Sequence, residues 1–418
     1  MGSIILLFIN KRKSLKFQHR RITMKNVIRI ICAVLALILA VSCLTSCGKK
    51  EENKAIKIGA TGPLTGGAAI YGLAAKNGAS LAVEEINALG GVQFDIRYED
   101  DTHDPEKAVN ALNVLKDWGM QICLGSVTSK PAVATSQECE DIFYLTPSAS
   151  STDVIGGVEN PLTGTVEIDR KPSIFQMCFV DPNQGSASAE YISEKNLGTK
   201  IAVIYKNDDV YSTGIYNSFK ADAENKGLEI VSTTTFTDDT STDFSVQVSE
   251  AKAAGADLVF LPIYYEAASM ILIEANKQGF APVFFGVDGM DGILTVEGFD
   301  TSLAEGVILL TPFNADATDE KTAKFVESYK TKFGEIPNQF AADGYDCVYA
   351  IYEAIKDEDI SASASAKDFC DLLTEKFSSG EFVYNGLTGD NMTWSESGMV
   401  SKAPKGMIIE NGAYKGLD

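Results

Sequence analysis

The stretch Ile56-Lys57-Ile58-Gly59-Ala60-Thr61-Gly62-Pro63-Leu64-Thr65-Gly66-Gly67 decides the fold. Its first four residues read as a strand, and a glycine-rich turn follows them. Apolar residues at helical spacing then run from Leu73 to Leu89, and Gly90-Gly91 end that helix before a second strand at 94–98. A strand, a helix and a strand in this order predict a βαβ unit within a parallel sheet.

The same alternation continues along the chain. Asp104-Pro105 is typical of a helix start and opens a helix that runs to Trp118. Between Thr152 and Pro172 the alternation lapses into a polar surface loop, and a second series of strands and helices follows. Two series of similar length predict an α/β fold of two doubly wound, Rossmann-like lobes. Further strands are expected at 122–124, 143–145, 174–177, 201–205, 229–236, 258–261, 283–285, 392–394 and 406–409, and helices at 131–139, 184–196, 214–226, 244–253, 267–278, 321–333, 347–355 and 369–377.

The segment before the first strand has the features of an export signal. A basic region around Lys25 and Arg29 precedes the uncharged run 30–41, and small residues lead to Cys47. The run is shorter than the roughly 20 apolar residues that a membrane span needs. We therefore expect residues 1–46 to be a signal peptide, with Met24 as its expected true start.

A cysteine just after such a segment resembles the lipobox of bacterial lipoproteins. Cys47 is the expected lipidation site, because Leu44 fits the lipobox better than the Ala40 that stands before the alternative, Cys43. Residues 47–54 would then be a lipidated linker, and the protein would be exported and anchored to the outer face of the cytoplasmic membrane.

Charge and composition exclude several classes of function. Residues 1–46 carry eight Lys or Arg and no acid, so removing them from a net charge of −21 leaves about −29. A protein this acidic repels nucleic acid. Only His103 remains after processing, and the sequence contains no GxSxG and no phosphate-loop motif. No enzyme activity, cofactor or metal site is therefore expected.

Five cysteines follow the signal, at positions 123, 139, 178, 347 and 370. The number is odd, so at least one thiol is unpaired, and no spacing matches CxxC or a zinc site. The residues are expected to be small buried apolar groups.

Polar turns at the expected strand ends are candidates for binding. The turns 125–129 and 146–150 carry hydroxyls ahead of helix starts, where unsatisfied N–H groups favour a carboxylate. Asp288 follows a strand of the second half and is suited to an ammonium, and Tyr211 and Tyr264 lie at neighbouring strand ends. As plain alternatives, the serines are helix caps, Asp288 belongs to a solvated turn, and the tyrosines lie on exposed loops.

A set of motifs in order resembles the leucine/isoleucine/valine-binding family, which are substrate-binding proteins of ABC transporters with the type I periplasmic binding fold. The resemblance runs from Ile56 to about Gly412. Its motifs are 62–66, Tyr71-Gly72, 82–87 with Gly90-Gly91, Asp100-Asp101 with Asp104-Pro105, 146–149, Asp181 with Gln184-Gly185, Tyr205 with 208–211, 286–289, Tyr345-Asp346, and 386–389 with Ser397-Gly398.

The resemblance implies a role for particular residues. The ligand α-carboxylate would be held by the hydroxyls of Ser129 and Ser150 and by a backbone group at Ser148. The ammonium would meet Asp288, which is one methylene shorter than the glutamate often found there. The aromatic residues that close over the ligand match Tyr71, Tyr211 and Tyr264.

The resemblance also implies three crossings between the lobes, near Cys178–Asp181, Thr311–Asn314 and Leu387–Thr388. The N-terminal lobe is then 55–180 plus 314–387, and the C-terminal lobe is 181–313 plus 388–418.

The implied function is that of an extracytoplasmic lipoprotein that captures a free amino acid, branched-chain or similar, for an ABC importer. Its partners would be that ligand, the permease and ATPase subunits, and the membrane through the lipid alone, and a monomer is expected. One alternative stays open: a sensor of the same fold that binds an amide or another amino-acid-like compound and signals to a receptor.

Overall fold

The computed structural model describes residues 55–157 and 170–417. The expected signal peptide, its start at Met24, both candidate lipidation sites and the linker 47–54 lie outside the described residues. Residues Ala55–Asp418 form one compact unit. Among the described residues, no helix is long and apolar enough to cross a membrane.

The first of two sheets is wholly parallel, with strand order β2-β1-β3-β4-β5. Strand β1 lies beside β2 in a register that pairs Ile56 with Phe94 and Gly62 with Asp100. This is the βαβ unit that the opening stretch predicts. The strands are β1 (Ile56–Gly62), β2 (Phe94–Asp100), β3 (Ile122–Leu124), β4 (Phe143–Thr146) and β5 (Ile174–Gln176).

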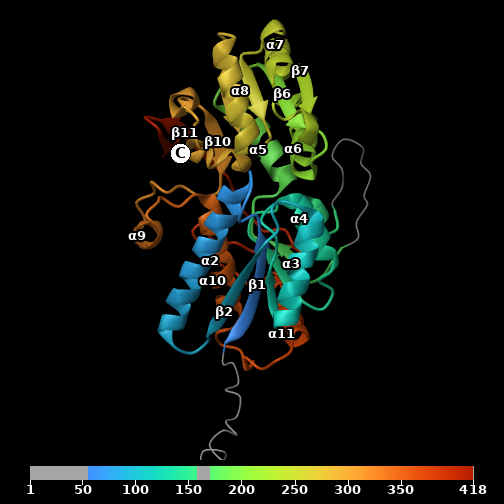
Figure 1. The fold of residues 1–418 in the computed structure, drawn as a ribbon, viewed down its shortest axis with the longest axis vertical. Coiled ribbons are helices and arrows are strands. Elements are labelled where there is room, and N and C mark those ends of the chain that lie inside the picture. The colour runs from blue at the N-terminus through green and yellow to red at the C-terminus, as the bar shows by residue number, and fades with distance from the viewer. Residues whose placement is uncertain (1–54, 158–169, 418) are drawn as a thin grey trace, which may run out of the picture. The chain divides into compact units, whose positions relative to one another are not determined.

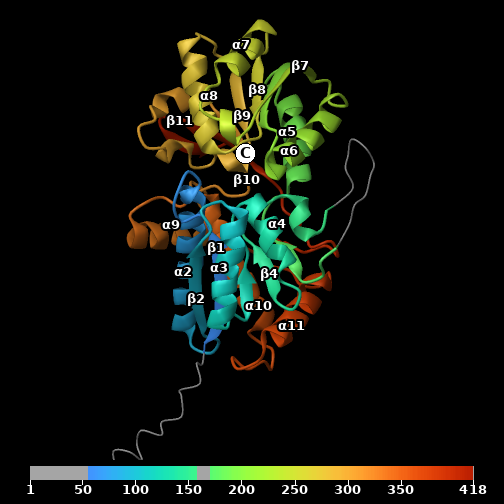
Figure 2. The same ribbon diagram turned by 45° about the vertical axis from the view of Figure 1, so that its right-hand side comes forward.

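Helices cover both faces of this sheet (Figures 1 and 2). One face packs Ile58, Leu124 and Phe143 against three helices, and the other packs Cys123 and Tyr144 against two. The first three helices are α2 (Ala69–Leu89), α10 (Gln339–Ile355) and α11 (Ala366–Ser378); the other two are α3 (Pro105–Trp118) and α4 (Ser129–Gln137).

The second sheet has the order β12-β11-β10-β9-β8-β6-β7. Strands β7, β6, β8, β9 and β10 are parallel to one another. Strand β11 pairs antiparallel with β10, and β12 pairs antiparallel with β11 at the edge of the sheet. The strands are β6 (Lys200–Lys206), β7 (Glu229–Phe236), β8 (Leu258–Leu261), β9 (Val283–Gly286), β10 (Ile308–Thr311), β11 (Lys405–Glu410) and β12 (Ala413–Gly416).

Two helices cover each face of the second sheet. Helices α5 (Asp181–Glu194) and α6 (Val210–Ala223) pack on Val203 and Phe260, and α7 (Ser245–Ala253) and α8 (Tyr265–Lys277) pack on the opposite face. Each lobe therefore has a sheet between two layers of helices, which is the Rossmann-like arrangement that the sequence predicts. The remaining elements are α9 (Glu320–Phe333) and the short 3-10 turns η1 (Thr152–Ile155), η2 (Asp238–Thr240), η3 (Asp288–Met290), η4 (Ile293–Thr295) and η5 (Thr301–Ala304).

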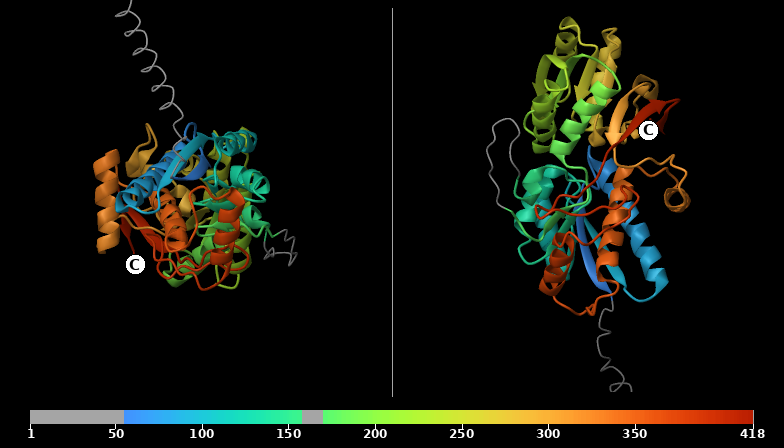
Figure 3. Two further views of the ribbon diagram at one scale, coloured as in Figure 1. Left: turned by 90° about the horizontal axis from the view of Figure 1, so that it is seen from below. Right: turned by 180° about the vertical axis from the view of Figure 1, so that it is seen from behind.

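The chain passes between the sheets three times: from β5 to α5, from β10 to α10, and before β11 (Figure 3). The third passage lies later than the predicted Leu387–Thr388, which is a correction to the predicted boundary. Trp394 is buried in the core of the first lobe, and its indole Nε1 donates to the carbonyl of Gln176 on β5 at 2.9 Å. Residues 388–402 thus pack with the first lobe, and the passage lies between Lys402 and Lys405.

Local signals explain where elements begin and end. The Asp104 carboxylate accepts from the backbone N–H of Lys107 at 2.8 Å, and Pro105 occupies the first turn of α3. That helix stops at Gly119, whose φ of 85° is the left-handed conformation that favours glycine. The acidic stretch 99–104 therefore contains the end of β2 and the helix start that Asp104-Pro105 predicts.

The five cysteines of the described residues are free and buried. Cys123, Cys139, Cys347 and Cys370 pack within the apolar cores of the first lobe. Burial raises the pKa of the Cys178 and Cys347 thiols well above the ordinary value. This fits their expected role as small apolar groups.

Candidate functional site

The site lies where turns after the first-lobe strands face turns after the second-lobe strands, as expected for open α/β sheets. Six of the seven predicted site residues line one cavity of about 10 Å³. That volume is close to the minimum for one water molecule, so a larger ligand enters only when the lobes move apart. The six are Tyr71, Ser129, Ser148, Tyr211, Tyr264 and Asp288; Val127, Thr128, Gly289 and Phe340 complete the lining.

The end of the site that suits an anion is formed by residues of the first lobe. Helix α4 begins at Ser129 directly behind the cavity, and no side chain caps its first turn. The Ser129 hydroxyl accepts from the N–H of Ser151 at 3.2 Å. Free N–H groups at a helix start, together with a hydroxyl, suit a carboxylate.

The other two predicted serines behave differently from each other. The Ser148 hydroxyl donates to the carbonyl of Val127 at 2.6 Å, so its side chain already has a hydrogen-bond partner. The Ser150 hydroxyl is buried without a hydrogen-bond partner among the described residues. Ser150 does not line the cavity itself but lies next to it, beside Asp181.

The end of the site that suits a cation is formed by Asp288, the first residue of η3 after strand β9. The Tyr211 hydroxyl donates to its Oδ1 at 2.7 Å and accepts from the N–H of Gly289 at 2.9 Å. Burial raises the pKa of Asp288 to about 7, the Tyr211 hydrogen bond lowers it, and the charge of Asp343 raises it further. Asp288 is therefore a buried acid poised to pair with a cation.

A second acid at this end was not predicted as a site residue. Asp181 is the first residue of α5 and is 1% exposed. Among residues 55–157 and 170–417, neither of its carboxylate oxygens has a hydrogen-bond partner. Burial raises the pKa of Asp181 well above its ordinary value; the nearby Ser150 hydroxyl lowers it only in part, and Asp288 raises it. Gly214 leaves room for it, since a Cβ there would lie 2.8 Å from its Oδ2. The available signal was its place in the motif of Asp181 with Gln184-Gly185.

Aromatic side chains form the walls. The rings of Tyr211 and Tyr264 are stacked with centroids 4.7 Å apart and planes 4° from parallel. Tyr71 is tilted against Tyr264 at 5.5 Å and against Phe340 at 4.5 Å. Burial raises the pKa of all three tyrosines well above 10, so their hydroxyls stay protonated and able to donate. Phe340, which comes from α10, was not predicted.

Direct contacts already join the two lobes across the cavity. The Tyr71 hydroxyl donates to the carbonyl of Gly289 at 2.5 Å, and the Tyr265 hydroxyl donates to the carbonyl of Gly67. At the rim, Lys130 Nζ lies 3.8 Å from an Asp238 carboxylate oxygen. The described structure is therefore a closed arrangement of the lobes.

His103 lies at the same rim. Its Nδ1 shares a hydrogen bond of 2.8 Å with the Thr128 hydroxyl, and its ring meets the Tyr264 ring edge-on at 5.6 Å. Burial lowers the pKa of His103. Within residues 55–157 and 170–417, no three His, Cys, Asp or Glu side chains are grouped so as to hold a metal ion.

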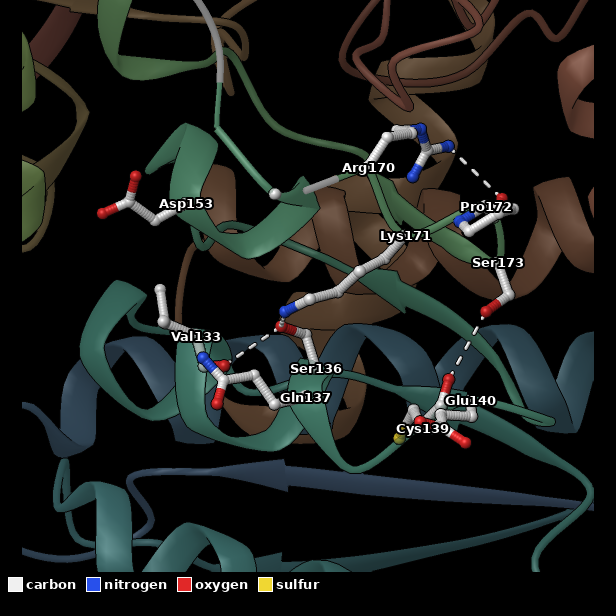
Figure 4. A pocket seen from close by; sticks show the side chains of 11 residues that line it. Val133, Ser136, Gln137, Cys139, Glu140, Asp153, Arg170, Lys171, Pro172 and Ser173 are labelled. Carbon is white, nitrogen blue, oxygen red and sulfur yellow. Dashed lines mark hydrogen bonds between the residues drawn. The ribbon is translucent and has the colours of Figure 1, made fainter. Parts of the chain in front are cut away.

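A larger hollow of about 840 Å³ lies between α4 and residues 170–173 (Figure 4). Its basic side chains are engaged: Lys171 Nζ donates to the Ser136 hydroxyl at 3.2 Å, and Arg170 donates to the carbonyls of Ile174 and Pro172. None of the predicted site residues lines this hollow.

Comparison with known proteins identifies the family of this chain. The model of a family described as periplasmic binding protein matches residues 55–402. A Leu/Ile/Val-binding protein homolog 3 of Brucella melitensis is 27% identical over 354 residues, 83% of this chain and 89% of the relative. A leucine-, isoleucine-, valine-, threonine- and alanine-binding protein of Pseudomonas aeruginosa is 26% identical over 72% of this chain and 78% of its own.

Solved structures agree. The branched-chain amino acid transporter substrate-binding protein LivJ of Streptococcus pneumoniae, in complex with isoleucine, has a TM-score of 0.75 and 26% identity, covering 87% of this chain and 99% of that one. A solute-binding protein of an R. palustris ABC transporter, in complex with benzoate, has a TM-score of 0.72 at 18% identity over 87% of this chain and 95% of that one, a likeness of fold alone.

Proposed function

The chain belongs to the periplasmic binding protein family, a family of ligand-binding proteins and not of enzymes, and on that premise we propose that it is the extracytoplasmic substrate-binding lipoprotein of an ABC importer for branched-chain amino acids. Its relatives are named for binding leucine, isoleucine and valine. The proposal comprises three parts: a branched-chain amino acid as the ligand of this chain, the lipid anchor and the ABC importer.

The observation that carries the proposal is the opposite chemistry of the two ends of one site. The uncapped start of α4 at Ser129 favours an anion, and the buried acid Asp288 favours a cation. A free amino acid is the simplest ligand with both charges. Asp181 and Ser150 lie beside each other outside the cavity lining. Within the described part of the chain the Asp181 carboxylate and the Ser150 hydroxyl have no hydrogen-bond partner, and they would add a second acceptor and a hydroxyl near the ammonium.

The buried acid Asp288 also distinguishes this chain from proteins of the same fold that bind other ligands. Benzoate, bound by the R. palustris protein, has a carboxylate and an aromatic ring but no cation. A ligand without an ammonium would give the buried Asp288 carboxylate no cationic partner, so it would lose the attraction that an ammonium gains there. The acids therefore support an amino acid over a simple carboxylate.

Ligand capture would proceed by closure of the two lobes around their passages. The first lobe of this proposal is 55–180 with 314–402, and the second is 181–313 with 403–418. The serines belong to one lobe and Asp288 to the other, so a zwitterion that touches both favours the closed state. The closed state would then engage the permease with its ATPase, and the protein would act as a monomer.

Export and anchoring follow from the N-terminal sequence. The signal-like segment before Cys47 and its lipobox support a lipoprotein on the outer face of the cytoplasmic membrane. A lipid would keep the binding protein close to its permease.

A thermal-shift titration tests the ligand. L-leucine, L-isoleucine and L-valine should each raise the unfolding temperature in proportion to the logarithm of their concentration, because only the folded protein binds them. Benzoate should leave it unchanged. A shift with benzoate and none with the amino acids would contradict the proposal.

A further inference from the structure

The loop that carries Asp288 is held from the opposite lobe by Gln339. Gln339 is the first residue of α10, which packs on α2 in the first lobe, and it is 1% exposed. Its side-chain Nε2 donates to the carbonyl oxygen of Asp288 at 2.9 Å. Its backbone N–H donates to the carboxylate of Asp291 at 2.9 Å. Both ends of the turn Asp288–Asp291 are therefore bound to one residue.

A third hydrogen bond fixes the orientation of the Gln339 amide. The Thr311 hydroxyl, at the end of β10, donates to Gln339 Oε1 at 2.9 Å. With its oxygen accepting from Thr311, the amide must present its nitrogen to Asp288. Thr311 stands where the chain leaves the second lobe, so the amide connects this passage to the acid-bearing turn.

These contacts are not needed to cap the helix. The Asn338 side chain already caps α10, since it accepts from the N–H of Ala341 at 3.1 Å. The turn is also closed internally, because the Asp291 N–H donates to the Asp288 carbonyl at 2.9 Å. The side-chain hydrogen bond of Gln339 thus adds a contact between lobes to a turn and a helix that are each complete without it.

A second first-lobe donor lies beside it. The Tyr71 hydroxyl bonds the carbonyl of Gly289, and Gln339 Nε2 bonds the carbonyl of Asp288. Two consecutive carbonyl oxygens of the same turn therefore point at donors of the opposite lobe. Both bonds exist only while the lobes are closed.

We propose that Gln339 is a positioning residue that couples closure of the lobes to the orientation of Asp288. On closure, Gln339 and Tyr71 bind the two carbonyls and hold the turn in the position that presents the Asp288 carboxylate to the ligand. Opening breaks these bonds and releases the turn together with the ligand. This inference rests on the proposed binding of an amino acid by Asp288.

The proposed coupling stabilises the closed state, so its loss should change the dissociation rate constant of the ligand. Gln339→Met keeps the volume of the side chain but removes the donor and the acceptor. A lost buried hydrogen bond corresponds to about a ten-fold change in an equilibrium constant. We expect the dissociation rate constant of L-isoleucine to rise about ten-fold, with the association rate constant changed less than about two-fold, as is usual for contacts of the bound state. Stopped-flow fluorescence measures both.

Gln121→Met is the matched control. Gln121 makes equivalent hydrogen bonds inside the first lobe, to the carbonyls of Ala362 and Ala364 and from the N–H of Lys57. Its loss should lower the unfolding temperature without changing either rate constant. A loss of general stability would move both variants alike, whereas positioning moves only Gln339→Met.

Thr311→Val is a second test that leaves α10 intact. It removes the donor that orients the Gln339 amide, and a rise of about three-fold in the dissociation rate constant is expected from a weakened hydrogen bond. Unchanged dissociation in both Gln339→Met and Thr311→Val would overturn the inference while leaving the proposed function standing. Absence of L-isoleucine binding by the wild type would instead contradict the proposed function and, with it, this inference.

Discussion

The hydroxyl of Tyr211 donates a hydrogen bond to the carboxylate of Asp288 across 2.7 Å. The same hydroxyl accepts from the N–H of Gly289, so the phenol fixes the acid and its backbone together. The Tyr211 ring is in turn stacked on Tyr264. The aromatic wall of the site thus also holds the acid that is proposed to bind the ligand.

The pH dependence of binding should follow Asp288. Its pKa in the free protein is raised to about 7 by burial, and only the ionised form pairs with an ammonium. Ligand affinity should therefore fall as the pH drops below about 7, by up to about ten-fold per pH unit. Calorimetric titrations between pH 5.5 and 8.5 measure this slope.

Asp288→Asn is the control for that slope, because the amide does not titrate. The variant should bind weakly at every pH in the range, with no slope between 6 and 8. An unchanged slope in Asp288→Asn would assign the titration to another group.

The Asp181 carboxylate should lower the free energy of unfolding of the ligand-free protein. Its folded pKa is raised by burial, so its contribution destabilises the fold as the pH rises above the ordinary carboxyl value. Asp181→Asn should raise the free energy of unfolding at pH 8 by on the order of 1–3 kcal/mol and should change it little at pH 4. Urea unfolding at both pH values checks this. A variant that is destabilised at pH 8 would contradict the unpaired state of this acid.

The ion pair of Lys402 and Asp343 should be essential for stability. Lys402 Nζ lies 2.9 Å from Asp343 Oδ1, and both side chains are buried. Lys402→Met leaves a buried acid unpaired, so urea unfolding should show a loss of about 3–5 kcal/mol. Lys415→Met, which breaks the exposed pair with Asp316, should cost less than about 1 kcal/mol. Equal losses in the two variants would contradict the difference in burial.

The lipid anchor should depend on Cys47. Cys47→Ser should release the protein from the membrane fraction of cells, whereas Cys43→Ser should leave it bound, because only Cys47 follows the lipobox-like Leu44-Thr45-Ser46. Immunoblots of the membrane and medium fractions measure the distribution. Release by Cys43→Ser alone would exchange the roles of the two cysteines.

Much of the first lobe is predictable from the sequence because its signals are local. The start of α3 at Asp104-Pro105 and the short apolar strand β3 are read directly from neighbouring residues. Strand β8 of the second lobe is read in the same way. Strand β10 (Ile308–Thr311) was not predicted, although its short, fully buried apolar run is of the same kind as those of β3 and β8. The first turns of α10 were missed because Asp343 and Gly344 interrupt its apolar spacing. Asp343 is tolerated there only through Lys402, 59 residues away.

Some residues of the candidate site are predictable from the sequence and others are not. Residues at strand ends, such as Ser129 and Asp288, are predictable because parallel strands bring their ends to one edge. Gln339 and Phe340 reach the site only through the passage from β10 to α10. No local pattern indicates that a helix start in the first lobe faces a turn of the second.

The most direct test of the account is a calorimetric comparison of L-leucine with 4-methylpentanoate, which lacks the ammonium, and L-leucinamide, which lacks the carboxylate. If one end of the site binds an anion and Asp288 binds a cation, L-leucine should bind at least about 100-fold more tightly than either analogue, since each loses a buried charged contact. Equal affinity for L-leucine and 4-methylpentanoate would contradict the role of Asp288 and the account built on it.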